Sequence, residues 1–69
     1  KLSFAEKREF EKLEKDIERL ENQKNELEAL MNSGALPHEE LYEKSIELNE
    51  VKASLDEKEF RWLELSEMS

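Results

Sequence analysis

Hydrophobic residues recur along the first half of the chain at alternating intervals of three and four. The series is Phe10, Leu13, Ile17, Leu20, Lys24, Leu27 and Met31. This spacing places the side chains on one face of an α-helix and is typical of the a and d positions of a coiled coil. A second series with the same spacing comprises Leu41, Lys44, Leu48, Val51, Leu55, Lys58, Trp62 and Leu65. We therefore expect two amphipathic helices, each with an apolar stripe, which we term its seam.

Local residues indicate where each helix begins and ends. Ser3 and Glu6 have the spacing of a capping box, in which each residue satisfies a free backbone amide of the other. Residues 32–34 (Asn-Ser-Gly) form the only cluster of turn-forming residues, and the glycine suits the left-handed position after a helix. Pro37 suits the first turn of the next helix. The predicted elements are a helix over residues 4–31, a turn over 32–37 and a helix over 38–67.

Two helices of similar length joined by a short turn bury their seams most simply against each other. The sequence therefore predicts an all-α fold, a two-helix antiparallel coiled-coil hairpin that forms a single domain over residues 1–69. If Phe10 faces Leu65, the residue numbers of facing partners sum to 75. A slip by one heptad would place Lys24 against Lys44, and repulsion between the two ammonium groups disfavours that slip.

Composition excludes several classes of function. The 69 residues include 43% charged residues, one glycine and no cysteine, and the net charge is −8. A chain of this size forms a small core, and a two-helix hairpin provides no desolvated pocket for acid–base catalysis. Thiolate metal sites and glycine-rich phosphate loops are also excluded, and no apolar run approaches the length of a membrane span. We therefore expect no catalytic, metal or cofactor site in this chain and no membrane contact.

Charge is distributed unevenly along the chain. Residues 1–19 contain six basic and six acidic side chains, whereas residues 20–69 contain five basic and thirteen acidic ones. Four cations recur at intervals of four, three and four on the side of the first helix away from its seam, and we term them the basic ridge: Arg8, Lys12, Lys15 and Arg19. A cation at every turn can follow successive phosphates of a nucleic acid. Because the ridge itself contains no aromatic residue, we expect contacts to the backbone rather than to the bases.

The full set of candidate nucleic-acid-binding residues includes the expected neighbours of the ridge. The set is Lys7, Arg8, Lys12, Lys15, Arg19, Lys58 and Arg61. An ordinary solvated helix face would have the same appearance, because Glu11–Lys15 and Asp16–Arg19 are helix neighbours that form stabilising pairs. The residues alone therefore leave both interpretations open.

Three stretches resemble a known family. They are KLSFAEKREFEKLEKDIERLE (residues 1–21), PHEE (37–40) and EKEFRWLELSE (57–67). They are similar to the C-terminal domain of the ABC-F proteins, which are twin-cassette ATPases, and most of all to the Uup-type branch. The resemblance implies a non-catalytic coiled-coil domain excised from a larger cytoplasmic ATPase, whose ATP and Mg bind elsewhere. In that family the domain is associated with nucleic-acid binding and the parent proteins act at or near the ribosome, so the implied partner is DNA or ribosomal RNA.

A second apolar stripe lies off the seam of the second helix. It comprises Tyr42, Ile46, Ala53, Phe60 and Leu63. A hairpin of two helices cannot bury this stripe, which therefore indicates a docking surface for the ATPase body, another partner or a second copy of the hairpin. Alternatively, the aromatic side chains fold over the edge of the seam. The competing function is a purely structural or dimerising coiled coil without nucleic-acid affinity.

Overall fold

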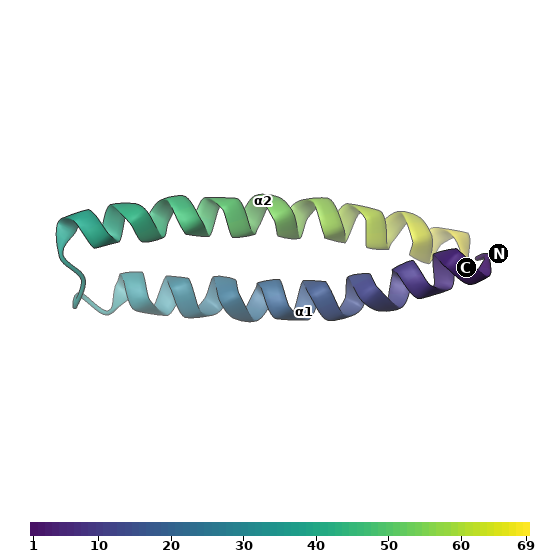
Figure 1. Ribbon diagram of the computed structural model, residues 1–69, viewed down its shortest axis with the longest axis horizontal. Helices are drawn as coiled ribbons and strands as arrows, with labels where there is room; N and C mark the ends of the chain where they lie inside the picture. Colours follow the sequence, from purple (N-terminus) through teal and green to yellow (C-terminus); the bar gives the residue numbers. More distant parts are fainter.

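A computed structural model describes residues 1–69 as two antiparallel helices joined by one short turn (Figure 1). Helix α1 spans Phe4–Asn32 and helix α2 spans His38–Met68, each within one residue of the range expected from the sequence. The molecule measures 50 × 15 × 14 Å, and the two termini lie together at one end (Figure 1). Neither helix contains an apolar stretch that could cross a membrane. The expected all-α helical hairpin is confirmed.

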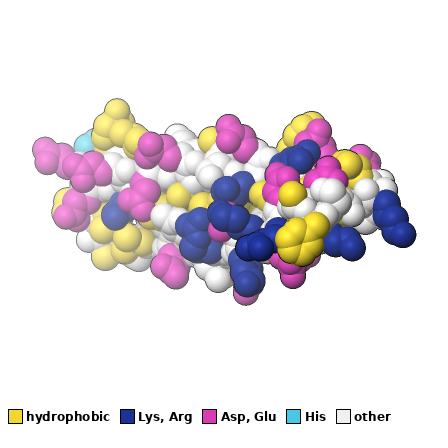
Figure 2. Space-filling view, turned by 45° about the vertical axis from the view of Figure 1, so that its right-hand side comes forward, with side chains coloured by type: hydrophobic (Ala, Val, Ile, Leu, Met, Phe, Trp, Pro, Cys, Tyr) yellow, Lys and Arg dark blue, Asp and Glu magenta, His cyan; other side chains and the backbone are white.

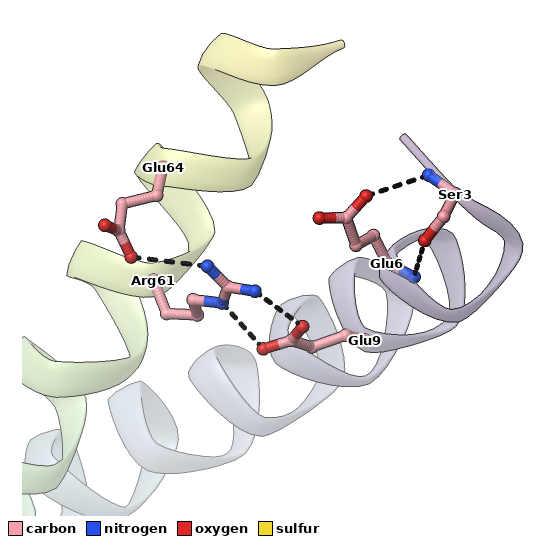
Figure 3. Close-up of polar contacts among 5 residues, drawn as sticks. All are labelled: Ser3, Glu6, Glu9, Arg61 and Glu64. Atoms are coloured by element: carbon pink, nitrogen blue, oxygen red, sulfur yellow. Dashed lines mark hydrogen bonds and ion pairs between the residues drawn. The ribbon is translucent and has the colours of Figure 1, made fainter. Parts of the chain in front are cut away.

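The capping box predicted at the start of α1 is present. The backbone N–H of Glu6 donates to Ser3 Oγ at 3.1 Å, and the backbone N–H of Ser3 donates to Glu6 Oε1 at 2.9 Å (Figure 3). These bonds satisfy amides that the helix itself leaves without partners. The backbone N–H and then the hydroxyl of Ser3 stabilise the charged form of the carboxylate, so the pKa of Glu6 lies below its usual value.

The turn between the helices depends on one glycine. Gly34 has a φ of 76° and is the only residue with a positive φ, as expected for the residue that reverses the chain after a helix. Ser33 closes the end of α1 by donating from Oγ to the Leu30 carbonyl at 2.6 Å and accepting from the Ala35 N–H at 3.2 Å. Pro37 is the last residue of the turn, in agreement with the expected helix start at residue 38. Its extended ψ of 157° makes it the residue before α2 rather than part of the first helical turn.

The core consists of seven buried side chains, and each belongs to one of the two predicted seams. They are Leu13, Leu20, Leu27, Leu48, Val51, Leu55 and Leu65. Five of them form one cluster from the middle of the hairpin toward the turn, with Ile17 and Met31 packed against it. Toward the termini, Leu65 is fully buried, and the rings of Phe10 and Trp62 stack with centroids 5.5 Å apart. Aromatic stacking therefore closes the seam at this end.

Ion pairs on the two edges of the hairpin define how the helices are aligned. Glu9 pairs with Arg61 on one edge, and Glu28 approaches Lys52 to 4.0 Å on the other. The residue numbers sum to 70 for Glu9–Arg61 and to 80 for Glu28–Lys52. The two edges therefore deviate by the same amount, in opposite directions, from the sum of 75 expected for the seam. A slip by one heptad would move both sums by seven and separate the partners. The contacts therefore agree with the expected alignment, which keeps the seam lysines of the two helices apart.

Candidate nucleic-acid interface

The basic ridge lies on the exposed face of α1, in the half of the hairpin that carries the termini. All four of its side chains are exposed. Figure 2 shows lysine and arginine side chains gathered from the middle of the molecule toward the end with the termini, whereas acidic side chains surround the end with the turn. A protein with a net charge of −8 thus presents one surface that is rich in cations.

The carboxylate of Asp16 contacts three of the cations on this surface. Asp16 accepts from Lys12 Nζ at 3.2 Å and lies 3.5 Å from Lys58 Nζ and 3.8 Å from Arg19 Nη2. The hydrogen bond from Lys12 and the charge of Lys58 hold the pKa of Asp16 below its usual range. Three cations around a single carboxylate leave excess positive charge. Lys58 therefore joins the ridge from α2, as expected, and we term Lys12, Lys15, Arg19 and Lys58 the cationic patch.

Arg61 has a different environment from the cationic patch. Its guanidinium donates two hydrogen bonds to Glu9, from Nε at 2.8 Å and from Nη2 at 3.0 Å, and Nη1 lies 3.5 Å from Glu64 (Figure 3). The bonds from Arg61 lower the pKa of Glu9 and raise that of the arginine. This fork-shaped pairing connects the two helices. Because two carboxylates already neutralise it, Arg61 contributes little to an anion site.

The remaining candidate cations, Lys7, Arg8 and Lys15, form no ion pair within the molecule. The Arg8 guanidinium lies 5.8 Å from the ring centroid of Phe4, which is 76% exposed. Sequence reasoning missed this aromatic residue at the end of the ridge, although its position four residues before Arg8 places it on the same helix face. Lys7 points about 100° around the helix from Arg8 and lies off the ridge.

Comparison with known families identifies the family of this hairpin. A family model described as the ABC transporter C-terminal domain matches residues 1–67. The chain belongs to the ABC transporter C-terminal domain family. Comparisons with curated proteins and with solved structures found no match. The resemblance expected from the sequence is therefore confirmed at the level of a C-terminal domain of an ABC-type protein, while assignment to the Uup-type branch stays a prediction.

The ABC transporter C-terminal domain exposes all five apolar residues that the sequence indicated as a docking surface. Tyr42, Ile46, Ala53 and Phe60 are exposed and follow the outer face of α2, away from α1. The aromatic rings do not fold over the seam, since Tyr42 and Phe60 are 66% and 65% exposed. The fifth residue, Leu63, is 51% exposed and also lines a groove between the helices.

Proposed function

We propose that this ABC transporter C-terminal domain is a non-catalytic accessory domain that binds the phosphate backbone of a nucleic acid. The observation that carries the proposal is the convergence of Lys12, Arg19 and Lys58 on Asp16. With Lys15, the cationic patch has four cations, and Asp16 is the one carboxylate that forms ion pairs with them. Lysine and arginine side chains supply most of the affinity in backbone-directed binding.

The length of the basic ridge suits a polyanion rather than a single phosphate group. From Arg8 to Arg19 the ridge covers eleven helical steps, about 16 Å at ~1.5 Å per residue. One strand of duplex DNA places about five phosphates along this distance, at ~3.4 Å per nucleotide. We therefore expect binding that is independent of base sequence and strongly weakened by salt.

The proposal extends to the host protein. The resemblance of the two ends of the chain to ABC-F proteins supports a host that is a cytoplasmic twin-cassette ATPase of the Uup type, with ATP and Mg bound in its cassettes. DNA or ribosomal RNA is then the partner of the cationic patch. The outer face of α2, with Tyr42 and Phe60, provides a docking surface for the ATPase body.

Fluorescence anisotropy with a labelled 20-base-pair DNA duplex and a labelled RNA hairpin, at 50 and 200 mM salt, tests the proposal. The double variant Arg8→Gln/Lys15→Gln removes two ridge cations that form no ion pair, so the fold stays intact. We expect the slope of log K against log salt to become shallower by about two, because the slope approximates the number of phosphates neutralised. The control Lys44→Gln/Lys52→Gln removes the same charge from the first half of α2, together with the ion pairs of these lysines with Glu47 and Glu28, and leaves the slope unchanged. If both double variants made the salt dependence shallower by the same amount, a localised binding site would be contradicted.

The exposed outer face of α2 supports a second candidate, a structural hairpin that dimerises through this face. Sedimentation velocity at several protein concentrations separates the candidates. A dimer that Phe60→Ser converts to a monomer, together with no nucleic-acid binding at 50 mM salt, would favour the second candidate over the first.

A further inference from the structure

A groove lies between the helices on the edge opposite the Glu9–Arg61 ion pair. Its floor is apolar and consists of Ile17, Trp62 and Leu63, and its volume is about 460 Å³. Leu63 is 51% exposed, so the groove contains apolar surface that the hairpin itself leaves in contact with water. Burial of such surface by a partner is favourable.

Four carboxylates surround this apolar floor. Glu14, Glu18 and Glu21 border it from α1, and Glu59 borders it from α2. All four are exposed, and none of them takes part in the ion pairs of the hairpin. Like charges at neighbouring helix positions repel one another. A cationic partner would relieve this repulsion, whereas a nucleic acid would increase it.

The spacing of the border matches a helix. The three α1 carboxylates recur at intervals of four and three, over about 10 Å at ~1.5 Å per residue. A partner helix with cations at intervals of three or four presents its charges with the same repeat. The indole of Trp62 is held by stacking on Phe10, and an indole ring also attracts cations through its face.

We infer that this groove binds a basic amphipathic helix of a partner protein. An apolar side chain of that helix covers Trp62 and Leu63, and its lysines or arginines face the glutamates. A second copy of the hairpin fits less well, because the large apolar side chain of its ridge face, Phe4 beside Arg8, lies at the end of the ridge rather than between its cations. The inference does not rest on the proposed nucleic-acid binding, which uses the outer face of α1. The two surfaces adjoin at Glu18, which borders the groove and also lies beside Lys15 and Arg19.

The fluorescence of Trp62 provides a direct test. Trp62 is the only tryptophan of the chain, so its emission reports on the groove alone. The probe is a 16-residue amphipathic peptide of alanine, leucine and lysine, with the lysines three or four residues apart on one face. We expect saturable binding with a blue shift of the emission, because the peptide excludes water from the indole. The triple variant Glu14→Gln/Glu18→Gln/Glu21→Gln should weaken binding about tenfold at low salt, from the loss of three exposed ion pairs.

Two controls distinguish the groove from general attraction between a basic peptide and an acidic protein. The variant Glu39→Gln/Glu40→Gln/Glu43→Gln changes the net charge by the same amount near the turn and should leave the affinity within about twofold. A peptide of the same composition with scrambled order should bind at least tenfold more weakly. Three results would overturn the inference. The two triple variants could lose the same affinity, the scrambled peptide could bind as tightly as the ordered one, or the Trp62 emission could stay unchanged. A blue shift that depends on protein concentration alone, with a dimer in sedimentation, would assign the groove to a second copy instead.

Discussion

Charged side chains contribute to the structure of this hairpin as well as to its surface. Glu9 accepts two hydrogen bonds from Arg61 of α2, whereas Asp16 accepts one from Lys12 of its own helix and forms an ion pair with Lys58 of α2. The pKa of each carboxyl lies below its usual value because these cations stabilise the ionised form. Both residues lie on the edge of the seam, where they restrict how the helices can slide past each other. At the scale of single residues, the ion pairs therefore favour the same alignment as the apolar seams.

The pH dependence of one ion pair can be predicted with its sign. Because the pKa of Glu9 is lowered in the folded state, the stabilisation by the Glu9–Arg61 pair is fully present above the ordinary glutamate value of about 4.5 and is lost as the pH falls through the lowered value. The free energy of unfolding of the wild type should exceed that of Glu9→Gln at pH 7, and the difference should shrink below pH 4.5. Urea titrations followed by circular dichroism at pH 7, 5, 4 and 3 measure this difference.

The control for this prediction is Glu57→Gln, which removes an exposed carboxylate that has no ion-pair partner. The free energy of unfolding of Glu57→Gln should differ little from that of the wild type at pH 7. If the difference in free energy of unfolding between the wild type and Glu9→Gln stayed constant from pH 7 to pH 3, the charge of Glu9 would contribute nothing to stability.

At the scale of the helix, most of the structure follows from periodicity and local signals. The seam spacing indicated all seven buried residues, and the interval between Ser3 and Glu6 indicated the cap. Contacts between the helices were harder to foresee, because they depend on the alignment as well as on helix geometry. The pairing of Arg61 with Glu9 and the groove around Trp62 are of this kind. Neither is visible as a pattern within one helix.

The N-terminal cap of α1 gives a prediction at this scale. Ser3→Ala removes the hydroxyl that accepts from the Glu6 N–H, and loss of such a cap costs about 1 kcal/mol. Ser3→Asp retains an acceptor at the same position and should restore the stability. Urea unfolding at pH 7 measures both variants, and equal stabilities for Ser3→Ala and Ser3→Asp would contradict the role of the cap.

At the scale of the whole molecule, the core is small enough for one side chain to decide whether the chain folds. Leu55 is 5% exposed and belongs to the central cluster. Truncation of a buried leucine to alanine costs about 2–5 kcal/mol, which is comparable to the roughly 3–5 kcal/mol that a core of this size supplies. We therefore expect Leu55→Ala to lose much of its helical circular dichroism signal at 25 °C.

Leu63→Ala is the matched control, since it makes the same chemical change at an exposed position. It should retain the helical signal of the wild type and shift the urea midpoint only slightly. If the two variants lost the same stability, the buried seam would not be the main source of the folding free energy.

The antiparallel arrangement of the helices has a further electrical consequence. The macrodipoles of α1 and α2 point in opposite directions and largely cancel. The uneven placement of side-chain charges remains, because most lysine and arginine side chains lie toward the termini and few lie near the turn (Figure 2). The protein is therefore a permanent dipole along its 50 Å axis. In the field of a polyanion it rotates before contact, so that the end with the termini arrives first and the turn points away.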